Sequence, residues 1–337
     1  MHIEAGRNMR SLEQAIVRRC LSKLAIVYIA VLAQAVACAQ DLPKKAIRLL
    51  VPSAAGGPSD FVARLIAPKL GEAIDRNVIV DARGSVSGIV ATEIAAHAAP
   101  DGSTLAIGNN GTHVINAVLY RKLPYDPVRD FVPISKMVTA GTVLVANPKL
   151  EANTLREFIA SAKREPGRYV IAVAGANGAI ITEILRSATG IVLNNVPYKG
   201  SAPSEFAVVS GEAAVAMLSV PVAAPYVKSG KMKALGVTTA RRSSLLPDVP
   251  TIEEGGVEKF EFGNWHALFA PAGTPPPIVR RLHAEVVRIF DNPEIRSLVV
   301  ARGSEIVLST PQELGSALND DIARYRKIMA TAGIEPQ

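Results

Sequence analysis

The sequence predicts an α/β fold of two similar lobes, each a mainly parallel sheet flanked by helices, with a cleft between the lobes. Strand-like apolar runs alternate with helical patterns along most of the 337 residues, as expected for parallel strands joined by helices. The same order of strand, Gly-rich turn, helix and strand also occurs twice, from about residue 46 and again from about residue 168. The two stretches share little identity, so the repeat is inferred from the order of elements.

The first cycle begins with a strand, a small-residue turn and a helix. The turn is AAGGPSD, residues 54–60, in which Gly56 and Gly57 can adopt positive φ and Ser59 or Asp60 can cap the following helix. The expected elements, in order, are strand AIRLLVPS (46–53), a helix over about 59–74, strand NVIVDA (77–82), a helix over about 88–98 and strand STLAIGNN (103–110).

The second cycle starts with RYVIAVAGANGAIITEIL (168–185) and continues into IVLNNVPYKGSAPSEFAVV (191–209). TAGTVLVANP (139–148) is the expected strand that leaves the first lobe, and KMKALGVTTA (231–240) is the expected strand that returns. A last helix, over about 311–332, opens with a Thr-Pro pair and an early glutamate, which is typical of helix starts.

Because the chain crosses between the lobes twice, we assign residues 41–142 and 240–337 to lobe 1 and residues 143–239 to lobe 2.

The N-terminus has the features of a secretory signal peptide. Basic residues precede the apolar run LAIVYIAVLAQAVA (24–37), which is too short for a comfortable membrane span and is followed by small residues. We expect residues 1–39 to be cleaved off near Ala39 and the mature protein to reside in the periplasm. Lipid anchoring at Cys38 is the alternative, but the three residues before it lack the leucine usual at such sites.

Composition narrows the possible partners. Both cysteines, Cys20 and Cys38, lie in the leader, so the mature chain would have neither a thiol nor a disulfide. Without the leader, 32 basic and 28 acidic residues remain. The basic residues are scattered and few aromatic residues lie among them, so we expect no nucleic-acid partner. A mild bias towards small anionic ligands remains.

Motifs for catalysis or metal binding are missing from the sequence. AAGGPSD lacks the lysine of a phosphate-binding loop, and no G-x-S-x-G motif frames a serine. Asp60 has no identifiable partner for work as a general base. The histidines are far apart without ligand spacing and are expected to be surface or packing residues: His97, His113, His266 and His283. We predict a non-enzyme with no catalytic residue, metal or cofactor.

Three turns are candidates for ligand contacts. Ligands of open α/β sheets bind beyond the carboxyl ends of the strands, where helix N-termini present free N–H groups. The turns 54–60, GNNGTH (108–113) and AGANG (174–178) each follow such a strand. Facing one cleft, they would offer backbone donors to a carboxylate; otherwise they are plain turns. Lys199 could likewise meet an anion or be a solvated turn lysine, whereas Trp265 is expected to pack in the core or at a lobe edge.

Six long, non-repetitive stretches resemble the Bug family, the substrate-binding proteins of the tripartite tricarboxylate transporter system. They are KAIRLLVPSAAGGPSDFVARLIAPKLGEAI, APDGSTLAIGNNGTHVINAVLY, LPYDPVRDFVPIS, GIVLNNVPYKGSAPS, RRSSLLPDVPTIEEGG and WHALFAPAGTPPPIV. The resemblance covers nearly all of the mature chain. It implies a type II periplasmic-binding-protein-like fold that closes on a small carboxylated ligand. It also implies transient delivery of that ligand to membrane transporter subunits.

In this family the turn matching residues 53–60 binds a ligand carboxylate, largely through backbone groups and water, and a turn of the other lobe completes the site. The ligand-binding residues expected here are Ser53, Ala55, Gly56, Gly57, Ser59, Asp60, Asn110, Thr112, Gly175, Asn177 and Lys199.

The chain departs from the family pattern at three places. Ser53 stands where a bulky residue is usual, AGANGAIITEIL is Ala/Ile-rich and about two residues shorter, and GEAAVAMLSVP lacks the usual acidic residues. The second-lobe part of the pocket should therefore be less polar, which favours a mono- or dicarboxylate with an apolar or aromatic body.

The predicted function is that of a periplasmic, monomeric protein that binds this carboxylate for transport. A sensor subunit that presents its ligand to a membrane receptor, or a secreted enzyme that uses the cleft, are the alternatives.

Overall fold

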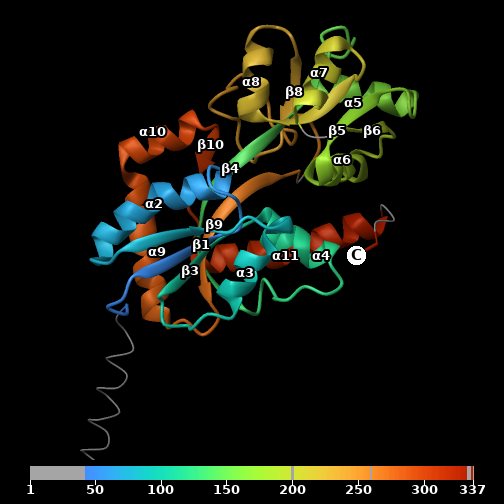
Figure 1. Ribbon diagram of the computed structural model, residues 1–337. Helices are drawn as coiled ribbons and strands as arrows, with labels where there is room; N and C mark the ends of the chain where they lie inside the picture. Colours follow the sequence, from blue (N-terminus) through green and yellow to red (C-terminus); the bar gives the residue numbers. More distant parts are fainter. Residues whose placement is uncertain (1–41, 199–200, 259, 332–334, 337) are drawn as a thin grey trace, which may run out of the picture.

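The structure is a computed structural model that describes residues 42–198, 201–258, 260–331 and 335–336. The predicted signal peptide and Lys199 lie outside these residues. The described chain forms two α/β lobes, one above the other in Figure 1. This confirms the predicted two-lobe fold.

The sheet of the first lobe has the strand order β2-β1-β3-β9-β4, with β10 also paired to β4. Alternating apolar residues of β1, such as Leu49 and Leu50, are buried on opposite faces of this sheet. The strands are β1 (Ile47–Val51), β2 (Val78–Ala82), β3 (Thr104–Asn109), β4 (Phe131–Ala146), β9 (Gly263–Pro271) and β10 (Ser304–Ile306).

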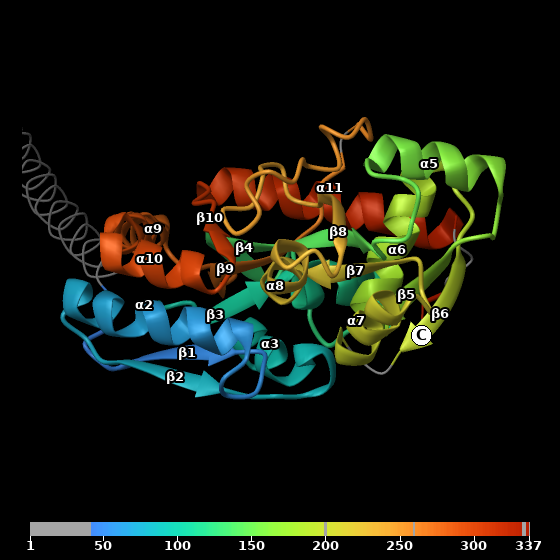
Figure 2. The same ribbon diagram turned by 90° about the horizontal axis from the view of Figure 1, so that it is seen from above.

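Helices cover both faces of this sheet. One face packs against α2 (Pro58–Ile74), α9 (Pro276–Asp291) and α10 (Pro293–Ala301). The other face packs against α3 (Ile89–Ala96), α4 (Asn116–Leu119) and α11 (Pro311–Thr331). Figures 1 and 2 both show α11 extending from the first lobe to α6 of the second, and buried side chains of the two helices share one core.

The second lobe repeats the arrangement on a smaller scale. Its sheet has the order β4-β7-β5-β6, with β8 also paired to β4. Its strands are β5 (Val170–Ala174), β6 (Asn194–Tyr198), β7 (Val215–Ser219) and β8 (Lys233–Val237). Its helices are α5 (Leu155–Arg164), α6 (Gly175–Thr189), α7 (Ser201–Ser210) and α8 (Val220–Lys228).

Strand β4 belongs to both lobes. Residues 131–141 pair with β9, whereas residues 142–146 pair with β7 and β8, so the partners change at Gly141. Strands β4, β8 and β9 pair antiparallel with their neighbours. Strands β2, β1 and β3 of the first lobe pair parallel, as do β6, β5 and β7 of the second. The expected parallel pairing thus holds for these outer strands, and the antiparallel strands make each sheet mixed.

The segment after β8 remains with the second lobe for some distance. Val237 donates a backbone hydrogen bond to Pro250 and accepts one from Ile252, and Gly255 lies against the side chain of Leu155 in α5. The chain then passes to β9. The predicted lobe boundary at residue 240 remains a proposal, and these contacts favour a second crossing closer to residue 260.

Candidate functional site

The first candidate turn joins β1 to α2. Gly57 is the N-cap residue of α2, with φ −72° and ψ 169°, and Pro58 is the first helical residue. The expectation that Ser59 or Asp60 caps the helix is therefore wrong, because both lie inside its first turn. The amides of Ser59 and Asp60 have no acceptor within the helix, since helical N–H groups bond four residues back. They leave two donors at the positive end of the helix dipole.

The two glycines of this turn differ in conformation. Gly56 has φ +84°, which favours glycine, whereas Gly57 is extended and does not use positive φ. A Cβ on Gly57 would lie 3.1 Å from the Ser53 hydroxyl oxygen and 3.2 Å from the Ala54 carbonyl oxygen. Residues 54–56 are exposed, so their backbone is open to solvent.

The Asp60 side chain connects the turn at Gly56 to α2 by hydrogen bonds. Its buried carboxylate accepts hydrogen bonds from the Gly56 N–H and from Nε of Arg64, each 2.8 Å long. The Arg64 hydrogen bond lowers the pKa of Asp60 below its usual value, and the Gly56 hydrogen bond adds to this, although burial acts in the opposite direction. Asp60 is thus an ionised carboxylate that already has two donors.

The second candidate turn lies beside the first and is tied to it by Asn109. The Asn109 side-chain amide donates to the Ser59 hydroxyl at 3.2 Å and accepts from the Thr112 N–H at 2.9 Å. Thr112 is the second residue of the π-helical segment Gly111–Ile115. Sequence reasoning missed Asn109, although the adjacent pair of asparagines at the end of a strand pointed to this place.

Asn110 is almost fully buried, and its side chain interacts with that of Tyr325. It lines a cavity of about 220 Å³ with Trp265 and Tyr325. Its side chain therefore lies towards β9 and α11, and Asn109 makes the link to the first turn.

A third turn, which follows β2 and contains Gly84 and Gly88, packs against the other two turns at the same edge of the sheet. Gly88 has φ +71°, and a Cβ there would lie 2.7 Å from Cβ of Pro52 and 2.9 Å from Cγ2 of Thr112. Gly84 similarly approaches the backbone of Ala54. Only glycine allows this close packing of the three turns. Sequence reasoning did not select this turn, although its glycines were the available signal.

In the second lobe, Gly175 and Asn177 lie in the first turn of α6, directly after β5. The N-cap residue is Ala174, which makes no side-chain cap, so this helix start also offers unpaired amides. The structure thus gathers Ser53, Ala55, Gly56, Gly57, Ser59, Asp60 and Thr112 at one edge of the first lobe. It places Gly175 and Asn177 at the equivalent edge of the second.

The buried histidines are packing residues. The His113 ring stacks on Phe269 with centroids 4.1 Å apart, and its Nδ1 lies 2.9 Å from the Thr112 hydroxyl. Burial lowers the pKa of His113 to about 3 and that of His266 to about 4, so both rings are neutral. Trp265 packs in the same core, as predicted.

In the part of the chain that the structure describes, no group of three or more His, Cys, Asp or Glu side chains is arranged to hold a metal ion. No helix of that part of the chain is long and apolar enough to cross a membrane.

Most of the chain matches a known protein family. Residues 62–334 match the model of the tripartite tricarboxylate transporter family receptor. Protein BugT of Bordetella pertussis is 30% identical over 88% of this chain and 91% of its own length.

Solved structures extend this similarity. An R. palustris protein with adipate is 33% identical, with a TM-score of 0.69, and covers 88% of this chain and 100% of its own. MatC from Rhodopseudomonas palustris with bound malate is 31% identical, with a TM-score of 0.65, and covers 85% of this chain and 99% of its own.

Proposed function

Because the chain belongs to the tripartite tricarboxylate transporter receptor family, we propose that it captures a small carboxylate and delivers it to a membrane transporter of that type. The observation that carries this proposal is the start of α2. Its glycine cap leaves the amides of Ser59 and Asp60 unpaired, and Asn109 ties this turn to the next one. A helix start with free donors attracts a carboxylate without a nearby cation.

We propose a ligand with one or two carboxylates and an apolar or aromatic body. The two R. palustris proteins were solved with adipate and malate, which are both dicarboxylates. In this chain α6 begins with GANGAII and β7 reads VAMLS, so charged side chains are missing from both segments. An apolar ligand body would contact such a surface at a lower desolvation cost than a polar one.

In this proposal the two turns of the first lobe hold one carboxylate, through residues 53–60 and Thr112. The helix start at Gly175 and Asn177, with Lys199, closes over the ligand from the second lobe. The protein acts as a monomer in the periplasm, after cleavage near Ala39, and contacts its transporter only transiently. Family membership and the free donors at both helix starts support this arrangement.

The ligand can be found by native mass spectrometry of freshly purified mature protein, followed by calorimetric titration with adipate, malate and benzoate. We expect stoichiometric binding of at least one carboxylate and no turnover of it. Turnover of a bound compound would instead favour an enzyme.

The site itself is tested by Gly56→Val. We expect affinity to fall at least ~10-fold, about 1.4 kcal/mol, because valine is strained at the positive φ of Gly56 and adds a side chain on the exposed surface where the ligand is proposed to bind. Gly230→Val is the matched control, since Gly230 has φ +71° and an added Cβ there meets no atom within 4 Å. If folded Gly56→Val protein binds like the parent, the first turn is not part of the site.

A further inference from the structure

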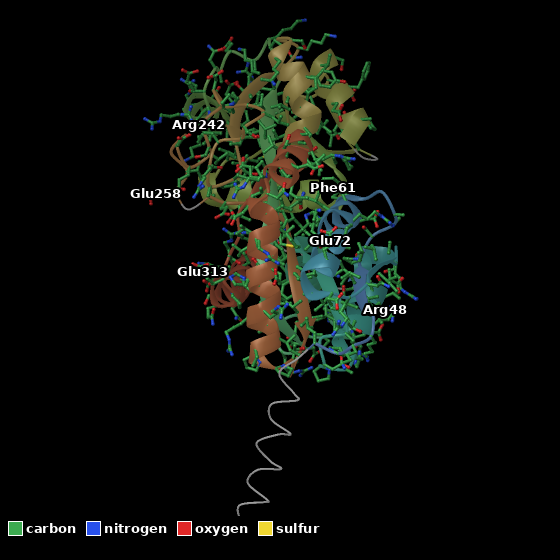
Figure 3. The ribbon with its side chains drawn as sticks, turned by 90° about the vertical axis from the view of Figure 1, so that its left-hand side faces the viewer. Arg48, Phe61, Glu72, Arg242, Glu258 and Glu313 are labelled. Atoms are coloured by element: carbon green, nitrogen blue, oxygen red, sulfur yellow. The ribbon has the colours of Figure 1, made fainter. Side chains whose placement is uncertain are left out.

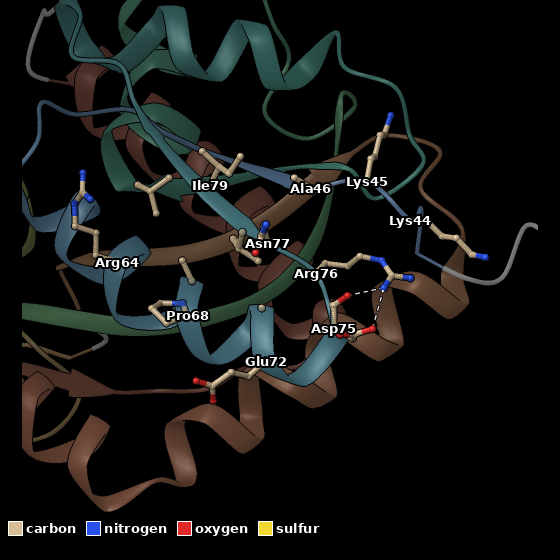
Figure 4. A pocket seen from close by; sticks show the side chains of 14 residues that line it. Lys44, Lys45, Ala46, Arg64, Pro68, Glu72, Asp75, Arg76, Asn77 and Ile79 are labelled. Carbon is tan, nitrogen blue, oxygen red and sulfur yellow. Dashed lines mark hydrogen bonds and ion pairs between the residues drawn. The ribbon is translucent and has the colours of Figure 1, made fainter.

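A groove of about 1,020 Å³ runs along the outer edge of the first lobe, between β2 and α2. Its walls are β2, the outward side of α2 and the chain segment 44–46 that precedes β1 (Figure 4). In Figure 3 the labelled Arg48 and Glu72 mark this side of the molecule, while Arg242 and Glu258 lie in the other lobe. Of the residues at the candidate ligand site, none lines this groove.

The backbone of β2 is open towards the groove. Among the described strands, β2 pairs with β1 alone. Ile47 N–H donates to the Asn77 carbonyl oxygen at 2.8 Å, and Arg83 N–H donates to the Val51 carbonyl oxygen at 2.9 Å.

Successive residues of a parallel strand alternate in the direction of their backbone groups, so residues 77, 79, 81 and 83 bond to β1. The N–H and C=O groups of Val78 and Val80 therefore face outward. Both residues line the groove, and Ile79 between them is 57% exposed. A polypeptide in extended conformation can bond to this edge.

The floor of the groove allows a close approach. On α2 it consists of the small residues Ala67 and Gly71 and of Pro68. Pro68 has no N–H, so the carbonyl group of Arg64, four residues earlier, lacks its usual helical donor. This carbonyl is a further acceptor on the wall of the groove.

Charge is distributed unevenly in the groove. Lys44, Lys45 and Arg76 lie at one end, and Arg64 lies at the other (Figure 4). The acidic lining residues are Glu72 and Asp75, and the Asp75 side chain is fully exposed. The lining thus has four basic and two acidic residues, with basic residues at both ends.

We propose that this groove is a docking site for an extended acidic segment of a partner protein, which adds to the free edge of β2 as a further strand. Main-chain hydrogen bonds to Val78 and Val80 would supply affinity, and acidic residues near both ends of the segment would pair with the basic residues. The proposal is independent of the ligand proposed above, since it concerns a different surface.

The probe is the labelled peptide Ac-Glu-Glu-Thr-Val-Thr-Val-Glu-Glu-NH2, titrated into the mature protein and followed by fluorescence anisotropy. Two companion peptides carry Gln in place of Glu, or N-methyl groups on the central residues. We expect binding to weaken at least ~10-fold for each companion, because one loses the charges and the other the strand hydrogen bonds. Equal binding of the N-methylated peptide would overturn strand addition.

The protein variant is Lys44→Glu with Lys45→Glu, matched to a control with Lys163→Glu and Lys231→Glu, two exposed lysines of the second lobe. Arg64 is left unchanged because it bonds to Asp60. We expect the groove variant to lose at least ~10-fold in peptide affinity and the control to keep the affinity of the parent.

Equal losses in both variants would mean non-specific attraction and overturn the proposal. The docking proposal would also be overturned if the groove variant self-associates in sedimentation runs but binds the peptide normally. In that case Lys44 and Lys45 would serve only to keep the edge strand from pairing with other copies of the protein. Urea unfolding curves like that of the parent, followed by the fluorescence of Trp265, would show that the variants are folded.

Discussion

Acid should destabilise the protein measurably through His113. Burial lowers the pKa of His113 to about 3, whereas an unfolded histidine has a pKa of about 6.5. The unfolded chain therefore takes up the proton first. The contribution to stability is complete above pH 6.5 and is lost progressively as the pH falls from 6.5 towards 3. The Nε2 atom of His113 has no hydrogen-bond partner among the described residues, so an added proton there finds no acceptor.

The magnitude follows from these two pKa values. At pH 5 the linkage relation gives a loss of about 2 kcal/mol in the free energy of unfolding relative to pH 8. His266, with a pKa of about 4, contributes a similar loss of about 2 kcal/mol over this range. Replacing His113 should therefore remove about half of the acid sensitivity that the two rings produce together.

The variant His113→Phe tests this reasoning. Phenylalanine keeps the stacking on Phe269 but loses the Thr112 contact, so it lowers stability at pH 8 by roughly 1–3 kcal/mol. Urea unfolding at pH 8, 7, 6 and 5 is followed by the fluorescence of Trp265, the single tryptophan, which is buried. The stability curves of parent and variant should approach each other by about 2 kcal/mol at pH 5. His97→Phe, which removes an exposed histidine, controls for the substitution. Curves that stay parallel from pH 8 to pH 5 would refute a buried, neutral His113.

Three further predictions concern stability, each measured by urea unfolding. Gly88→Ala should cost at least about 1 kcal/mol more than Gly230→Ala, because both have φ +71° but only Gly88 packs against Pro52 and Thr112; equal costs would contradict the packing of the turns. Asp60→Asn should cost roughly 1–3 kcal/mol at pH 7, and the difference should narrow below about pH 4 as Asp60 in the parent protonates; a constant difference down to pH 2 would argue against an ionised Asp60. Thr154→Ala should cost about 1 kcal/mol, since Thr154 and Glu157 form a capping box at α5; no loss would mean that the cap is dispensable.

Local signals explain what the sequence predicted correctly. The turn at residues 54–60 was recognisable because its glycines and proline determine backbone conformation within a few residues. The apolar runs of β1 and β5 likewise marked buried strands. These features depend on neighbouring residues alone.

Contacts between distant residues explain what was missed. Asn109 and Asn110 are adjacent and chemically identical, but only Asn109 meets Ser59, which is 50 positions away. Strand β4 begins at Phe131, eight residues before the predicted strand. Its early part contains proline and polar residues, and pairing with β9 and β10 holds it extended. Sequence alone does not specify such partners.

The capping of α2 shows how a wrong local prediction can still indicate the right site. Ser59 and Asp60 are good capping residues, and a serine cap would have used a helix-start amide internally. In the structure the cap is Gly57, and the Asp60 side chain bonds instead to the Gly56 N–H and Arg64. The helix start therefore keeps its donors.

Arg64 also brings the two proposed surfaces into physical contact. It lies at one end of the groove beside β2, is 58% exposed and bonds to the Asp60 carboxylate that holds Gly56. An acidic segment in the groove would compete with Asp60 for this guanidinium. The Asp60 carboxylate is buried, but it keeps its hydrogen bond from the Gly56 N–H, and the Arg64 side of the pair is largely exposed to solvent. Losing Arg64 to the docked segment should therefore change ligand affinity by no more than about 1 kcal/mol, roughly fivefold. Thermodynamic reciprocity then limits the effect of ligand on docking to the same factor. Docking and capture are thus adjacent but nearly independent functions, and each can be measured without the other.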